Sequence, residues 1–187
     1  VDIIETHDQR YLLTVMVDIT RRKVAEELLK ESEDRWSSAL ECSGNGVWDW
    51  DAVTNRVFFS KEWKSMLGYE EHEVGDSLQE WESRVHPDDW EMIQVELQKH
   101  FDGQTSVYGS EHRLRTRDGS YKWILDRGKV ISRDEVGKVL RVIGTHIDIT
   151  EIKKVQEDLN RTRGQLKAIL DNLPFLAWFK DKEGRHI

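Results

Sequence analysis

Three absences limit what this chain of 187 residues can do. Its single cysteine, Cys42, can form no internal disulfide, so a reducing cytoplasmic setting is the simplest expectation. No apolar run approaches the roughly 18 residues that a membrane-spanning helix needs, which argues against membrane insertion within this sequence. The formal net charge of -8 argues against a nucleic-acid surface, because binding to phosphates needs clustered Lys and Arg.

Motifs of the common enzyme classes are also missing. The sequence contains no glycine-rich nucleotide loop, no serine in a nucleophile elbow, and no histidine in the His-Glu-Leu-Arg-Thr-Pro setting of a sensor kinase phosphoacceptor. The Gly-Gly-Asp-Glu-Phe and Glu-Ala-Leu motifs of cyclic-dinucleotide enzymes are absent too. Acidic residues are many, but they follow helical faces and turns, as a solvated surface requires. The sequence therefore predicts no enzymatic activity for this segment.

The sequence repeats itself at a spacing of 130 residues (147 minus 17). Val17-Asp18-Ile19-Thr20 recurs as Ile147-Asp148-Ile149-Thr150, and three later pairs keep the same offset: Leu40 and Leu170, Trp48 and Trp178, Asp51 and Asp181. A constant offset through a turn, a charged helix and a strand indicates a window from a tandem array. We expect the C-terminal hairpin of a preceding module at 1–20, a connector helix at 21–44, a complete module at 45–150, a coiled-coil connector helix at 151–171, and the start of a following module at 172–187.

Both connector segments carry apolar residues at the alternating spacing of a coiled-coil seam. The first seam is Ala25, Leu29, Ser32, Trp36 and Ala39, and the second is Ile152, Val155, Leu159, Thr162, Leu166, Ile169 and Leu173. Thr20 and Thr150 stand where N-caps are expected, since a hydroxyl there can accept a bond from a free amide of the first turn. Because matching seams enter and leave the module, we favour a parallel coil between two copies over an amphipathic helix that folds back on its own sheet.

The central segment has the pattern of a mixed domain. Strand patterns predict five strands, at 46–52, 56–60, 107–117, 121–132 and 139–148. Helical spacing predicts helices at 61–67, 78–85 and 90–101, the last with the apolar stripe Trp90, Ile93, Leu97 and Phe101. Two strands, several short helices and a three-stranded meander are typical of an α+β fold with helices on one face of an antiparallel sheet.

Between about residues 35 and 150 the chain resembles a PAS domain, or sensory box, of the kind that carries a C-terminal PAC motif. The resemblance is carried, in order, by Trp48-Asp49-Trp50-Asp51, Phe59-Ser60, Trp63, Met66-Leu67-Gly68-Tyr69, His86-Pro87-Asp88-Asp89, Arg113-Leu114-Arg115, Asp118-Gly119, Trp123, Arg127-Gly128, Gly144 and Asp148-Ile149-Thr150. It implies a five-stranded antiparallel sheet in the order 2-1-5-4-3, flanking connector helices and a pocket between sheet and helices. It also implies a fragment of a bacterial tandem-PAS signalling protein.

The cofactors of this family find little support in the residues. Members that form a flavin photoadduct place a Cys on a central helix, whereas Cys42 precedes the first strand. Members that bind haem offer a His from the long helix, and His100 lies in its last turn. We therefore expect no cofactor, with flavin or haem as the alternative. The candidates for a pocket wall, for which structural packing is the simpler interpretation, are Trp48, Trp50, Trp63, Trp90, His100 and Trp123.

The histidines do not predict a metal site. His86 with Asp88 and Asp89 has the spacing that the end of one helix and the start of the next require. His112 and His146 lie in predicted strands, where one side chain could face the core and the other the solvent. For such histidines a structural role is the more common interpretation than metal ligation.

The functional hypothesis is a sensory and signal-relay module. Asp148 and Thr150, like Asp18 and Thr20, are expected to fix the point at which a last strand becomes a connector helix. A shift in the sheet would tilt or rotate that helix and so reach an output domain outside this sequence, a diguanylate cyclase or phosphodiesterase or a histidine kinase. The expected partners are a second copy, through the connector helices, and adjacent domains of the same chain. The alternatives are a ligand-free dimerisation scaffold and a small-molecule receptor.

Overall fold

The computed structural model describes residues 2–6, 9–13, 17–172, 182–183 and 185, which divide into two units, 1–43 and 44–187. The first unit holds strands β1 (Asp2–Thr6) and β2 (Gln9–Leu13), paired antiparallel, and helix α1 (Thr20–Ser43). The paired strands lie within the hairpin expected at 1–20, whose membership of a preceding module stays a prediction. On α1 the seam residue Leu29 is exposed, and the side chains of Trp36 and Ala39 lie outside the described part.

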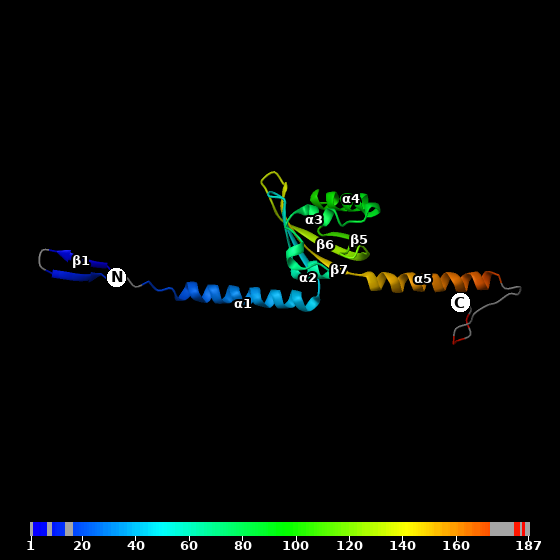
Figure 1. Cartoon of the computed structure of the whole chain (residues 1–187), viewed down its shortest axis with the longest axis horizontal. Helices are drawn as coiled ribbons and strands as arrows, with labels where there is room; N and C mark the ends of the chain where they lie inside the picture. The colour runs from blue at the N-terminus through cyan, green and yellow to red at the C-terminus, as the bar shows by residue number, and fades with distance from the viewer. Residues whose placement is uncertain (1, 7–8, 14–16, 173–181, 184, 186–187) are drawn as a thin grey trace. The chain divides into compact units, whose positions relative to one another are not determined.

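The second unit is built on one antiparallel sheet (Figure 1). Its strands are β3 (Gly46–Asp51), β4 (Arg56–Phe59), β5 (Tyr108–Arg115), β6 (Tyr121–Arg133) and β7 (Val139–Asp148). Their order across the sheet is β4-β3-β7-β6-β5, which is 2-1-5-4-3 when the strands of this unit are numbered alone. The predicted sheet order is confirmed.

Short helices connect β4 to β5, and their apolar side chains pack against one face of the sheet. They are α2 (Lys61–Met66), η1 (Glu71–Glu73), α3 (Leu78–Glu82), η2 (Pro87–Asp89) and α4 (Trp90–Phe101). Ser60 caps α2 by accepting a hydrogen bond from the Trp63 amide. The helix predicted at 78–85 ends at Glu82. The backbone after it bonds to β5 instead, because Val85 pairs with Leu114 and the Arg84 carbonyl accepts the Arg115 amide.

The core follows the alternation of the strands. Every second residue of β5, from Tyr108 to Leu114, is buried, and β7 shows the same alternation from Val142 to His146. These side chains meet the fully buried Trp63, Leu67 and Ile93 from α2, its C-cap and α4. The whole cluster comprises Trp48, Val57, Phe59, Trp63, Leu67, Val74, Trp81, Val85, Ile93, Leu114, Ile124 and Val142.

Helix α5 (Thr150–Asp171) follows β7 directly. The expectation that Thr150 is its N-cap was wrong: Ile149 holds that position, and the Thr150 hydroxyl accepts the Trp123 amide of β6 instead. Thr20 is likewise the first residue of α1 and not a residue before it. The seam residue Leu173 and nearly all of the predicted following module lie outside the described residues. None of the described helices is both long enough and apolar enough to cross a membrane.

Candidate functional site

A cavity of about 180 Å³ lies between the inner face of the sheet and helices α3 and α4. Its wall is mainly aromatic and aliphatic, and four polar side chains interrupt it. The lining residues are Trp48, Trp50, Val57, Phe59, Leu78, Trp81, Trp90, Leu97, Phe101, Tyr108 and Val142, with the polar Glu82, Gln94, Asp126 and His146. Enclosure by apolar side chains with a few polar groups is typical of a small-molecule site.

Two glycines give the indole of Trp48 its position across the sheet. Gly144 is the β7 partner of Trp48, and Gly128 on β6 is the partner of Gly144. A Cβ atom on Gly128 would lie 2.6 Å from Cη2 and 2.8 Å from Cζ2 of Trp48, and one on Gly144 would overlap the same ring. The indole therefore lies directly on these two strands, and its Nε1 donates to Asp126 Oδ1 over 2.9 Å.

A buried chain of polar contacts runs from α2 to the cavity. The Trp63 indole N–H donates to His146 Nδ1 over 2.8 Å, and His146 Nε2 lies 3.1 Å from Asp126 Oδ2. Asp126 and His146 are direct cross-strand partners on β6 and β7, which explains their contact. Both residues are only 2% exposed. The Asp126 carboxylate thus reaches the cavity between two N–H donors.

A second polar chain lies beside it on β5. The Tyr108 hydroxyl is 2.6 Å from Ser110 Oγ, which is 3.0 Å from His112 Nδ1. His112 Nε2 has no hydrogen-bond partner among the described residues. Burial lowers the pKa of His112 to about 4, and burial together with Asp126 raises the pKa of Tyr108, so both side chains are neutral at neutral pH. The opposed exposure considered for His112 and His146 was wrong, because both are buried.

Three of the six candidate wall residues line the cavity: Trp48, Trp50 and Trp90. Trp63 instead packs on Phe59 at 4.2 Å between ring centroids and acts through its bond to His146. Trp123 belongs to β6 and lies beside the first turn of α5, where Lys153 Nζ is 4.9 Å from its ring centroid.

His100 is buried outside the cavity lining. Its Nε2 accepts the Val130 amide over 3.1 Å, and its Nδ1 lies 2.9 Å from the Thr105 carbonyl oxygen. Since the first bond requires a lone pair on Nε2, the proton sits on Nδ1 and donates to Thr105. Both ring nitrogens are therefore already used, and neither points to the cavity as a haem ligand.

One cluster of buried side chains was not predicted from the sequence. His112, Asp126 and His146 bring potential ligand atoms within 4.8 Å of one another, all of them buried. Strand alternation was the available signal, because it places these residues on the inner face together. By contrast, His86, Asp88 and Asp89 lie at the helix boundary that the sequence indicated, where the His86 ring accepts the Asp88 amide at the start of η2. The carboxylate of Asp89 binds Arg113, a contact that the sequence did not predict.

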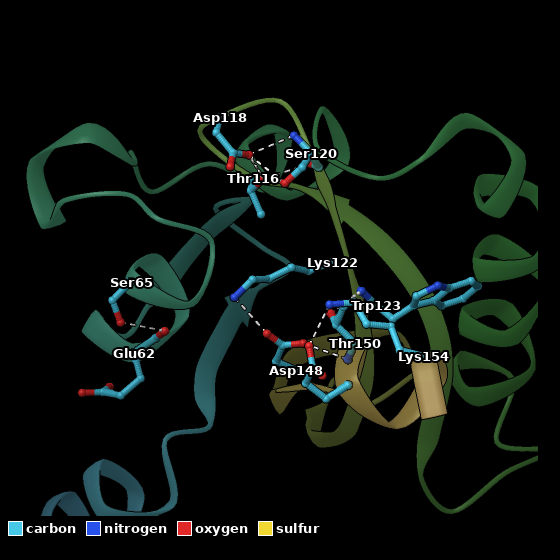
Figure 2. Close-up of polar contacts among 11 residues, drawn as sticks. Glu62, Ser65, Thr116, Asp118, Ser120, Lys122, Trp123, Asp148, Thr150 and Lys154 are labelled. Carbon is cyan, nitrogen blue, oxygen red and sulfur yellow. Dashed lines mark hydrogen bonds and ion pairs between the residues drawn. The ribbon is translucent and has the colours of Figure 1, made fainter. Parts of the chain in front are cut away.

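The junction between β7 and α5 forms a second candidate site (Figure 2). Asp148 Oδ1 accepts the Thr150 amide over 2.9 Å, and Oδ2 pairs with Lys122 Nζ over 2.9 Å. The Trp123 amide donates to Thr150 Oγ1 over 3.1 Å, and its carbonyl accepts the Ile149 amide over 2.9 Å. Although burial acts to raise it, the bonds from Thr150 and Lys122 hold the pKa of Asp148 below its usual value. The first residues of α5 are thereby bonded to β6 on both sides of Trp123.

The corresponding turn in the first unit has part of this arrangement. Asp18 Oδ1 accepts the Thr20 amide over 2.9 Å, and hydrogen bonding from the side chain and then the amide of Thr20 lowers the pKa of Asp18. Asp18 and Asp148 thus accept equivalent amide bonds at the two helix starts, while the roles expected of them in fixing those starts stay predictions.

Comparisons with known proteins agree with this architecture. A family model described as PAS fold matches residues 56–146. A sensory box histidine kinase/response regulator from Burkholderia thailandensis E264 is similar in structure, with 30% identity, a TM-score of 0.64, and coverage of 72% of this chain and 98% of that one. Among curated proteins, a probable diguanylate cyclase of Escherichia coli is 24% identical over 87% of this chain, and the sensor protein FixL of Bradyrhizobium diazoefficiens is 28% identical over 72%. The chain spans only 14% and 26% of the length of these two relatives.

Proposed function

The chain belongs to the PAS fold family, and from this membership we propose that it is a sensory and signal-relay module whose conformational state passes through α5 to an output domain beyond this sequence. Related PAS domains occur in diguanylate cyclases and histidine kinases, so these are the output classes that we propose. In this proposal the segment itself senses and relays, and the chemistry lies elsewhere in the protein.

The observation that carries the proposal is the bonding of α5 to the sheet. The Thr150 hydroxyl and the Ile149 amide hold the backbone of Trp123 from both sides. Lys153, one turn into α5, pairs with Glu111 on β5. A displacement of β6 against β7 must therefore either move the first turn of α5 or break these bonds. Such a junction couples the state of the sheet to the direction of the helix.

The exposed stripe on α5 supports a second copy as the partner. Ile152, Val155, Leu159, Leu166 and Ile169 are each more than half exposed, on a helix of 22 residues that is roughly 33 Å long. Coiled-coil pairing would remove this apolar surface from water. Thr162 interrupts the stripe with a hydroxyl, which weakens the seam and suits a coil that changes its packing. We propose a parallel dimer through α5, with α1 as its counterpart at the other end of the module.

Substitutions at Thr150 test the relay. Thr150→Val keeps the shape of the side chain but removes the acceptor for the Trp123 amide, whereas Thr150→Ser keeps the acceptor. In the full-length protein, we expect the valine variant to change the activity of the output domain by several-fold and the serine variant to resemble the wild type. Sedimentation measurements should show the same oligomeric state for both, because residue 150 lies outside the seam.

The seam offers an independent variant. Thr162→Leu should tighten dimerisation and bias the output, whereas the neighbouring Arg161→Leu, which lies off the seam, should do neither. The scaffold alternative expects output to follow dimerisation alone and to ignore the loss of the Thr150 hydroxyl. If the output activity is unchanged in both Thr150→Val and Thr162→Leu, the relay is refuted.

A further inference from the structure

We propose that the cavity between the sheet and helices α3 and α4 binds a small organic cation of the quaternary ammonium type, with the Asp126 carboxylate as its counter-ion. The inference deepens the proposed sensory function by naming the class of ligand that the module would sense. It stands on the hydrogen-bond pattern around Asp126, the aromatic wall and the size of the cavity.

The hydrogen bonds fix His146 as neutral. The indole N–H of Trp63 can only donate, so His146 Nδ1 must accept and carries no proton. The proton of His146 therefore sits on Nε2 and points to Asp126 Oδ2 at 3.1 Å. A protonated His146 would set two N–H groups against each other at the 2.8 Å contact with Trp63. His146 thus places an N–H group 3.1 Å from Asp126 but brings no positive charge.

Among the residues that the structure describes, no other group neutralises the carboxylate. Asp126 Oδ1 accepts the Trp48 N–H over 2.9 Å, and Oδ2 lies 3.1 Å from His146 Nε2, so both oxygens face N–H groups, as those of an ionised acid do. His112 is neutral because its burial disfavours the charged form. In the described part of the chain, no lysine or arginine forms an ion pair with Asp126. A buried charge without a partner is costly, and a cation in the adjoining cavity would remove that cost.

The wall of the cavity suits a cation that carries methyl groups. Trp81 and Trp90 lie 5.9 Å apart between ring centroids, and Trp50 lies 5.9 Å from Phe101. Indole faces attract cations more strongly than other aromatic rings, and aromatic cages are a known means of binding quaternary ammonium groups. Glu82, an exposed residue of the lining, adds a second negative charge where the cavity meets solvent.

The size of the cavity selects a compact ligand. Its volume of about 180 Å³ is near the roughly 150 Å³ of an engineered cavity that holds benzene. Pockets for drug-sized ligands start at roughly 300 Å³, and flavin and haem would need at least that much space. A trimethylammonium group is small enough, and most of its contacts would be with indole carbon atoms.

A metal ion is the competing occupant, because His112, Asp126 and His146 lie close together. A metal ligated through His146 Nε2 would displace the proton from that nitrogen, and the proton would have to move to Nδ1. Nδ1 would then face the Trp63 donor with a proton of its own. The observed bond between α2 and β7 therefore favours the organic cation and makes zinc the comparison arm of the test.

The test compares choline with 3,3-dimethylbutan-1-ol, which has the same shape without the charge. Titration calorimetry and thermal unfolding of the whole chain would measure the binding of each. We expect choline to raise the melting temperature and to bind at least roughly tenfold more tightly than the alcohol, since desolvated cation–π and ion-pair contacts act on the charged ligand alone. Asp126→Asn should abolish this preference, and Asp102→Asn, at an exposed position after α4, should preserve it.

Comparing the two ligands on the unaltered chain keeps the test valid if Asp126→Asn fails to fold. Equal binding of choline and the alcohol would refute the proposal, as would the absence of any choline binding at millimolar concentration. Zinc binding that choline cannot displace and that Asp126→Asn removes would refute it in favour of a metal site. These measurements need no output domain, so they can fail while the relay through Thr150 succeeds, and the reverse.

Discussion

Gly128→Ala should destabilise the domain by forcing Trp48 from its place on the sheet. The new methyl group would lie 2.6 Å and 2.8 Å from two carbon atoms of the indole, well inside van der Waals contact. Both close neighbours belong to a rigid ring that is held at its other end by the bond to Asp126. The ring must therefore move as a whole, and the Asp126 bond must stretch or break.

The expected cost combines two effects. Overpacking a well-packed core costs about 1–3 kcal/mol, and weakening a buried hydrogen bond to a charged group adds about 1 kcal/mol or more. A loss of about 2–4 kcal/mol in the free energy of unfolding corresponds to a fall in melting temperature of roughly 10–20 °C for a domain of about 100 residues. Gly109→Ala is the matched control, because a Cβ there would lie 3.9 Å from its nearest neighbour, the Asp126 carbonyl oxygen. This control should change stability by less than about 1 kcal/mol.

Urea unfolding followed by tryptophan fluorescence would measure both variants. A double-mutant cycle with Trp48→Phe isolates the contact, since the shorter phenylalanine ring lacks the two atoms nearest to residue 128. In the Trp48→Phe background, the cost of Gly128→Ala should fall by at least about 1 kcal/mol. An equal cost of Gly128→Ala in the two backgrounds, or a cost no larger than that of Gly109→Ala, would show that the indole does not set the requirement for glycine.

Two further predictions concern titration and ion pairing. His112 has a folded-state pKa of about 4 against an ordinary 6.5, so its contribution to stability is fully present above pH 6.5 and is lost as the pH falls to 4. The free energy of unfolding should fall by roughly 3 kcal/mol over this range. His112→Leu should remove this part of the pH dependence of unfolding, whereas the exposed His72→Leu should not. Asp89→Asn should cost about 2–3 kcal/mol in urea unfolding, because it weakens three bonds to Arg113, and the exposed Asp88→Asn should cost less than about 1 kcal/mol. Equal losses for the two asparagine variants would contradict this account of the ion pair.

The sequence predicts the sheet and α4 well because their signals are periodic. Strand β7 and helix α4 have the bounds that alternation and helical spacing indicate. The N-cap at Thr150 was wrong for a physical reason: its hydroxyl had two possible donors, the first turn of its own helix and the Trp123 amide, and only the fold shows that Trp123 is near. Local propensity cannot rank a partner 27 residues away.

The cavity was predicted only in part because its chemistry depends on cross-strand register. Alternation places Asp126 and His146 on the inner face, but it does not set them opposite each other. Their pairing depends on the register of β6 and β7, which shifts at an irregularity between Val130 and Ser132. A slip of one residue would turn either side chain to the other face. The sequence identifies the large aromatic side chains, but it does not show which of them line the cavity. Trp63 and Trp123 are as large as Trp48, yet Trp63 packs on Phe59 and Trp123 lies beside α5.

Strands β6 and β7 link the proposed cavity to the proposed relay. Asp126 pairs with His146 across these strands, and two residues further along Ile124 pairs with Asp148. The next residue of β6, Trp123, holds Thr150 and Ile149 at the start of α5. A charged ligand in the cavity would change the electrostatic force on Asp126 and His146. These two residues lie within one or two residue pairs of the junction. Because the two strands share a continuous hydrogen-bonded register over this distance, a change in their spacing at the cavity must be absorbed at the junction or passed into α5.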